Sequence, residues 1–294
     1  MKLGLVVHPG KSIALGIARE VVHALDGRCE IAVTDPVPEG AGLPGPRARL
    51  ESMRVDAIVA IGGDGTFLRV LRLNSAPLLA LNAGTVGVLS EVDARDASAL
   101  RAALDRLVEG NYFIEDCMKL GLRAGAISPR DATNEVVVHG HRTARMGHFE
   151  VALDGRVLGN IWADGIILAT PTGSTAYALS AFGPIVESGV EGIVLVAIAP
   201  FRAAPRAIVL DPLRTVSVRA LASGAPTVAV VDGQEEIEIP PEAPVTVYRS
   251  PRRARFVRFG ITPDLWRLRG KGILPWSDLE APPAPNDGGH DVSP

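Results

Sequence analysis

The first 112 residues alternate between two hydrophobic patterns. One is a short run of β-branched and aliphatic residues, as in LGLVV and VDAIVAI, which is typical of buried parallel strands. Such runs lie at 3–7, 55–61 and 77–81. The other pattern places apolar residues at helical spacing over 12–25, 66–73 and 97–109. Ser12 is positioned to cap the first of these helices. Strand alternating with helix predicts an α/β domain at 1–112, built on a parallel sheet.

The pattern changes after residue 112, where short β-rich segments follow one another. Turn signals such as Asp154-Gly155 and Asp232-Gly233 separate them. The segments are 134–138, 148–153, 165–169, 193–198, 215–219, 227–231 and 244–248. This arrangement predicts a second, β-rich (all-β) C-terminal domain over 113–254.

Two stretches have the composition of irregular chain. The segment 36–49 is too rich in Pro and Gly to form helix or strand, and we expect a mobile loop there. The tail 276–294, which contains APPAPNDGGHDVSP, is expected to be disordered.

Composition excludes several classes of protein. The chain has 294 residues, with 30 Lys and Arg against 33 Asp and Glu, and a formal net charge of −3. This near-neutral balance argues against nucleic-acid or anionic-membrane binding as the main function. Two cysteines are too few for a disulfide framework, and no apolar stretch approaches the roughly 18 residues of a membrane span. No signal-peptide cleavage pattern follows the first apolar run, so the sequence predicts a cytoplasmic protein.

The strongest chemical signal is Gly62-Gly63-Asp64-Gly65-Thr66, between a predicted strand and a predicted helix. Glycines let the backbone turn tightly, and the N–H groups of the turn and helix start can then bind phosphate. A carboxylate alone would repel phosphate, so Asp64 indicates a magnesium partner or a proton acceptor that faces a hydroxyl. The alternative is an ordinary turn in which Asp64 caps the helix.

Three further segments are candidates for ligand binding. Asn82-Ala83-Gly84-Thr85-Val86-Gly87 is a second glycine turn after a predicted strand, where α/β sheets bind ligands. The loop 170–177, TPTGSTAY, is dense in hydroxyls and suits the base and sugar of a nucleotide, although it could equally be a helix-capping cluster. Asn134-Glu135 could hold a ribose diol or could be a polar pair at a strand edge.

Other catalytic patterns are missing from the sequence. It contains no G-x-G-x-x-G fingerprint and no G-x-S-x-G elbow. The segment Gly4 to Gly10-Lys11-Ser12 resembles a P-loop but has five intervening residues where that motif has four. The histidines, including His139, His141 and His148, lack the spacing of a zinc site.

Four motifs together resemble the NAD kinase family. They are GGDGTFLR at 62–69, NAGTVGVL at 82–89, NEVVVH at 134–139 and DGIILATPTGSTAYALSAFGPI at 164–185. The resemblance covers about residues 1–275. GGDG is shared with diacylglycerol and sphingosine-type lipid kinases and with phosphofructokinases, whereas the TPTGSTAY block is specific to NAD kinases.

The resemblance implies phosphorylation of the 2′-hydroxyl of the adenosine ribose of NAD, with ATP or polyphosphate as donor, to give NADP. Asp64 would be the catalytic carboxylate, and a metal contact from it would run through water. The residues implied at the donor phosphates are Gly63, Gly65, Thr66 and Arg69. Those implied at NAD are Asn134 and Glu135 at the ribose, Asp164 at the nicotinamide end, and Thr172, Thr175, Ala176, Tyr177 and Ser180 around the adenine.

The resemblance also implies a homodimer or homotetramer, and a segment at 255–275 that returns to the N-terminal domain. We expect Mg²⁺ or another divalent cation to be required, because the sequence shows no cluster of cations sufficient to neutralise a triphosphate. No nucleic acid or membrane partner is expected.

Some positions depart from the family pattern. Val88 stands where phenylalanine is usual, Gly140 where a basic residue is common, and Phe182 where a glycine is expected. The segment 199–202 lacks the histidine that the family has near Pro200. Two alternatives follow: a non-catalytic NAD(P)-binding sensor, or a kinase of the same superfamily that acts on a lipid or a sugar.

Overall fold

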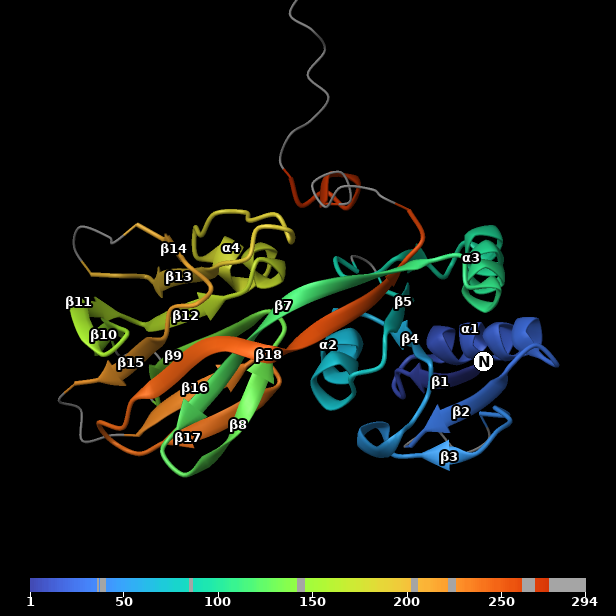
Figure 1. Cartoon of the computed structure of the whole chain (residues 1–294), viewed down its shortest axis with the longest axis horizontal. Coiled ribbons are helices and arrows are strands. Elements are labelled where there is room, and N and C mark those ends of the chain that lie inside the picture. Colours follow the sequence, from blue (N-terminus) through green and yellow to red (C-terminus); the bar gives the residue numbers. More distant parts are fainter. Residues whose placement is uncertain are drawn as a thin grey trace, which may run out of the picture.

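The computed structural model describes residues 1–35, 37, 41–84, 87–141, 146–201, 206–221, 226–260 and 268–274. The chain forms two lobes connected by two long strands (Figure 1). The N-terminal lobe holds a parallel sheet with helices, and the C-terminal lobe is mostly antiparallel β-structure. The fold class predicted from the sequence is therefore confirmed.

Five parallel strands form the N-terminal sheet in the order β5-β4-β1-β2-β3. They are β1 (Lys2–Val7), β2 (Glu30–Thr34), β3 (Arg47–Ala48), β4 (Ala57–Gly62) and β5 (Leu78–Asn82). The short β6 (Val92–Asp93) pairs in parallel with the end of β5. The helices are α1 (Ser12–Leu25), α2 (Asp64–Leu73) and α3 (Ala97–Glu109), with the short η1 (Leu50–Ser52) before β4. The bounds predicted for α1 and α3 are confirmed because the periodicity of each segment is strong and local.

The helices cover both faces of this sheet. α1 and α3 pack on the face that carries Leu5 and Val59, whereas α2 packs on the opposite face with Val6 and Ile58. The connection from β1 through α1 leads outward to β2, and the connection from β4 through α2 leads the other way to β5. The neighbouring strands β1 and β4 therefore flank a topological switch point, where open α/β sheets leave a crevice at the carboxyl ends of the strands.

The C-terminal lobe consists of two packed sheets. One contains β7 (Phe113–Ala124), β8 (Ile127–Ala132), β10 (Gly147–Leu153), β11 (Arg156–Ala163), β15 (Val216–Ala220) and β18 (Val245–Arg258). The other contains β9 (Glu135–Gly140), β12 (Gly165–Ala169), β13 (Ile193–Ile198), β14 (Ile208–Leu210), β16 (Thr227–Val231) and β17 (Glu235–Ile239). Alternate side chains such as Phe149 and Leu168 fill the core between the two sheets.

The long strands β7 and β18 join the two lobes (Figure 1). They pair with each other along most of their length, with a register shift between Arg249 and Arg253. Phe256, near the end of β18, pairs in parallel with Leu78 of β5. One continuous twelve-stranded sheet therefore runs from the edge of the C-terminal lobe to β3.

Two local expectations were wrong. Arg47 and Ala48 lie within the segment expected to be loop, but they form β3 by pairing with Val33 and Thr34 at the sheet edge. Ser12 does not cap α1: Lys11 occupies the N-cap position, and no side chain caps this helix. The predicted tail 276–294 lies outside the described residues. None of the helices in the described part of the chain has the length and apolar content that a membrane crossing requires.

Candidate active site

Asp64 links the two glycine turns. Gly63 is the N-cap of α2 and Asp64 is its first residue, so the alternative of Asp64 as the helix cap is excluded. The Asp64 carboxylate instead accepts the backbone N–H of Val88 at 2.9 Å and that of Leu89 at 3.1 Å. These two hydrogen bonds fix the carboxylate at the carboxyl end of the parallel sheet.

One glycine in each turn is needed for close packing. A Cβ on Gly62 would lie 2.5 Å from Thr66 Oγ1. Gly87 has a φ of +60°, and a Cβ there would lie 2.5 Å from the side chain of Asn82. The Asn82 Oδ1 accepts the N–H of Gly84 at 2.9 Å, which closes the second turn. Residues 85 and 86 of this turn lie outside the described residues.

Lys271 holds the loop that binds Asp64. Its ammonium donates to the carbonyl oxygens of Gly87, Val88 and Ser90, the last at 2.8 Å, and to Ser90 Oγ at 2.9 Å. The cation thus satisfies carbonyls on the loop whose N–H groups bind Asp64. A residue near the end of the described chain therefore supports the geometry of the first glycine turn.

A buried arginine supports the same loop from the other side. The Arg258 guanidinium is 5% exposed and donates to the carbonyl of Leu89 at 3.3 Å. It also pairs with Glu91 at 3.2 Å and with Glu115 at 2.7 Å, and Glu115 accepts the hydroxyl of Ser188 at 3.1 Å. Because the guanidinium is paired with two carboxylates, this network fixes the loop against β7 and β18 without leaving the buried cation uncompensated.

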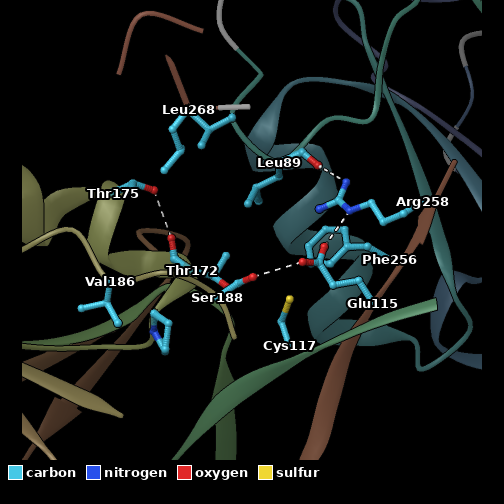
Figure 2. A pocket seen from close by; sticks show the side chains of 12 residues that line it. Leu89, Glu115, Cys117, Thr172, Thr175, Val186, Ser188, Phe256, Arg258 and Leu268 are labelled. Carbon is cyan, nitrogen blue, oxygen red and sulfur yellow. Dashed lines mark hydrogen bonds and ion pairs between the residues drawn. The ribbon is translucent and has the colours of Figure 1, made fainter. Parts of the chain in front are cut away.

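A small pocket of about 50 Å³ lies between the two lobes at this point. Figure 2 shows Leu89 and the Glu115–Arg258 pair on one side, and Thr172 and Thr175 on the other. Val88 also lines the pocket, so one of the family departures lies in the pocket wall. The pocket brings the loop of the second glycine turn and the hydroxyl-rich loop together.

The hydroxyl-rich loop has two kinds of residue. Thr170 and Ser174 are buried and brace the loop, since Thr170 Oγ1 accepts the N–H of Gly173 at 2.9 Å and Ser174 donates to the carbonyl of Pro171 at 2.6 Å. The capping alternative is wrong, because neither the short helix at 172–175 nor the helix that follows it has a side-chain cap hydrogen bond. Thr172 and Thr175, in the short helix η2 (Thr172–Thr175), instead line the pocket.

The Asp232 carboxylate holds the backbone of Asn134 and Glu135, although the sequence indicated Asp232 only as part of a turn. Asp232 accepts the backbone N–H groups of Thr133, Asn134 and Glu135 at 2.9, 2.7 and 3.2 Å. Burial, and then the nearby Asp232 charge, raise the pKa of Glu135 to about 8. A hydrogen bond from the backbone N–H of Tyr177 acts in the opposite direction and limits this rise. Within the described residues, Asn134 Oδ1 and Glu135 Oε2 are buried without hydrogen-bond partners. Such atoms mark a place where a polar ligand can bind.

The turn that contains Asp232 also contacts the GGDG helix. Gln234 donates to the carbonyl of Gly65 at 2.6 Å. Glu235 pairs with Arg72 of α2 at 2.7 Å and with Arg130 of β8 at 2.5 Å. This turn therefore contacts both the Asn134-Glu135 pair and the start of α2, which no local sequence signal indicates.

The remaining predicted site residues are not all gathered in one place. Gly63, Gly65, Thr66 and Arg69 line a second pocket, next to the loop between β1 and α1. Tyr177 is 46% exposed at the start of α4 (Tyr177–Ser180), and Ala176 and Ser180 flank it. Asp164 precedes β12, whereas the hydroxyl-rich loop follows it, so the two lie at opposite ends of a five-residue strand. That separation is roughly 17 Å within one chain.

The structure shows where two of the family departures lie. Phe182 has a φ of +62° and is 96% exposed, so a bulky residue adopts a conformation that favours glycine. Gly140 ends β9 and pairs with Thr227. Of the segment 199–202, Arg202 lies outside the described residues.

Two family models match the chain. The model of the ATP-NAD kinase N-terminal domain matches residues 47–112, and that of the ATP-NAD kinase C-terminal domain matches residues 133–259. An NAD kinase of Methanopyrus kandleri is 43% identical over 222 residues, which are 74% of this chain and 78% of that protein. An NAD kinase of Methanothermobacter thermautotrophicus is 36% identical over 275 residues, 91% of this chain and 94% of that protein.

A solved structure has the same fold. The crystal structure of an NAD kinase from Archaeoglobus fulgidus in complex with ATP aligns with a TM-score of 0.74 and 28% identity. The alignment covers 92% of this chain and 98% of that chain.

Proposed function

The chain belongs to the ATP-NAD kinase family, and from this premise we propose that it transfers a phosphoryl group from ATP to the 2′-hydroxyl of the adenosine ribose of NAD, giving NADP. The observation that carries the proposal is the Asp64 carboxylate, fixed by two N–H groups between glycine turns beside the pocket lined by Thr172 and Thr175. Phosphoryl transfer works mostly by positioning and charge stabilisation, and this arrangement supplies both.

Each residue of the proposed site has a distinct task. Asp64 accepts the proton of the attacking hydroxyl. The buried unpartnered oxygens of Asn134 and Glu135 hold ribose hydroxyls. With a pKa of about 8, Glu135 stays protonated at neutral pH and donates a hydrogen bond. Thr172, Thr175, Ala176, Tyr177 and Ser180 surround the adenine, and Asp164 meets the nicotinamide end.

The donor side of the site uses Gly63, Gly65, Thr66 and Arg69, with a divalent cation such as Mg²⁺. The described residues contain no group of three or more His, Cys, Asp and Glu side chains that could hold a metal. Mg²⁺ is commonly held by substrate phosphates and one or two carboxylates. Asp64 is the carboxylate available at the glycine turns. The bound cation would neutralise charge on the transferred phosphoryl group.

We also propose that the chain forms a homo-oligomer through the edge strand β11. This strand ends the twelve-stranded sheet and exposes Val157, Leu158 and Trp162 by 61%, 54% and 50%. Phe201, 56% exposed, lies beside it through an N–H bond to the carbonyl of Trp162. An exposed apolar strand edge favours association. Light scattering should give a mass that is a multiple of the mass of one chain. The mass of a single chain would show that this proposal is wrong.

A cytoplasmic location is proposed because Cys29 and Cys117 form no disulfide. The sensor alternative is less favoured, because nucleotide binding alone gains nothing from a carboxylate fixed beside phosphates. A lipid acceptor is disfavoured by the threonine hydroxyls at the pocket.

The test is NADP formation by the purified protein, read with an NADP-specific dehydrogenase. Signal must depend on NAD, on ATP and on Mg²⁺, each omitted in turn. Binding of NAD without any NADP, with either ATP or polyphosphate as donor, would favour the sensor.

A further inference from the structure

The second pocket occupies the crevice at the topological switch point. Its volume is about 420 Å³, and its walls come from the loop between β1 and α1 and from the GGDG turn. His8 and Lys11 line it on one side, and Gly63, Thr66 and Arg69 line it on the other. The sequence motif that failed as a P-loop, Gly10-Lys11-Ser12, thus lies opposite the proposed donor residues.

Lys11 also reaches the third loop of this sheet edge. Its Nζ lies 3.5 Å from the position that a Cβ on Gly84 would occupy. The absence of a side chain at Gly84 leaves room for the ammonium beside the second glycine turn. Lys11 therefore stands where the carboxyl ends of β1, β4 and β5 converge.

The two cations of this pocket have no partner among the residues that the structure describes. Within the described part of the chain, neither the Lys11 nor the Arg69 side chain makes an ion pair or a hydrogen bond. By contrast, Arg72 and Arg258 nearby are both paired with glutamates. An unpaired positive pocket favours an anionic ligand.

The backbone around the pocket adds partial positive charge. α1 has fourteen residues, no side-chain cap and no acidic residue in its first turn. α2 also begins without a side-chain cap. Uncapped N–H groups at helix starts favour anions. His8 accepts the N–H of Gly10 on Nδ1 at 3.1 Å, which leaves Nε2 as the donor of the ring.

We propose that Lys11 is a donor-binding residue, whose ammonium contacts the oligophosphate chain of the phosphoryl donor in this pocket. The inference rests on the proposed function for the identity of the reaction, but the anion site is testable by itself. Among the described residues, His8 is the only aromatic side chain that lines the pocket, so the pocket is suited to phosphate charge rather than to a base. Lys11 and Arg69 together supply the cations that composition alone did not indicate.

Lys11→Met removes the charge while keeping an unbranched apolar chain. Lys2→Met is the matched control, since Lys2 is exposed at the opposite end of the same strand, β1. Binding of inorganic tripolyphosphate and of NAD is measured separately by calorimetry, and thermal unfolding of each variant verifies the fold. Tripolyphosphate should bind Lys11→Met roughly ten- to a hundredfold more weakly, as expected for a lost charged hydrogen bond. NAD affinity and the control should not change, and Lys11→Arg should restore much of the binding.

In turnover, the KM for ATP should rise in Lys11→Met with little change in the KM for NAD. Unchanged tripolyphosphate binding, or an equal loss in both methionine variants, would overturn the inference whether or not NADP is formed. A loss confined to Lys11→Met in a protein that makes no NADP would support the anion site and reject the proposed function.

Discussion

Glu135→Gln tests the environment of the buried carboxyl group beside the pocket. The wild-type side chain is 6% exposed, and its Oε2 has no hydrogen-bond partner in the described part of the chain. Glutamine has nearly the same shape, can still accept the N–H of Tyr177 and does not titrate. The variant therefore removes the ionisation and leaves the packing almost intact.

The size of the effect follows from the pKa. Burial, the largest cause, raises the pKa of Glu135 from 4.5 to about 8 in the folded chain. Below pH 4.5 both states are protonated, and this residue adds no pH dependence. Between pH 4.5 and 8 only the unfolded chain loses the proton, so wild-type stability falls by about 1.4 kcal/mol per pH unit. At pH 8, the free energy of unfolding of the wild type relative to the glutamine variant has therefore fallen by on the order of 4 kcal/mol.

Urea unfolding of both proteins at several pH values between 5 and 8 measures this difference. The stability of Glu135→Gln relative to wild type should increase steadily with pH. Asp232 titrates in both proteins, so its contribution largely cancels. Glu238→Gln, on the exposed side of β17, is the control and should show no such trend. Parallel curves for wild type and Glu135→Gln would refute a raised pKa at this position.

Three other substitutions test separate parts of the structure. Asp64→Asn should lower kcat by about 100-fold or more while NAD binding persists, and full activity would remove Asp64 from the mechanism. Lys271→Met should lower kcat about 10- to 100-fold, because the loop that orients Asp64 loosens, and unchanged kcat would make the contact purely structural. Phe182→Gly should raise the unfolding free energy by about 0.5–1 kcal/mol by relieving the left-handed backbone, measured by urea unfolding. A loss of stability would show that the ring contributes more than its conformation costs.

Local features of the fold could be predicted from the sequence. The helix 97–109 is confirmed at both ends because it combines a strong period with clear end signals, the Asp96 cap and Gly110 in a left-handed conformation. The position of the GGDG turn at a strand end also follows from local pattern. The two-residue strand β3 could not be predicted, since its pairing depends on the neighbouring edge of the sheet rather than on its own composition.

The contacts that assemble the site connect distant parts of the chain. Asp232 reaches Asn134 across 98 residues, and Lys271 reaches Gly87 across 184. Such pairs depend on how the two lobes join through β7 and β18, which no local pattern encodes. Lys11 illustrates the same limit: its spacing fails as a P-loop, yet strand order brings it to the glycine turns.

The most direct test of the proposed activity follows the phosphoryl group itself. The protein is incubated with NAD, Mg²⁺ and ATP that carries a radiolabelled γ-phosphate, and the products are separated by chromatography. NAD kinase activity predicts label in NADP, with the phosphate on the 2′-hydroxyl of the adenosine ribose. Label that stays in ATP, appears only as inorganic phosphate, or enters another position of NAD would contradict it.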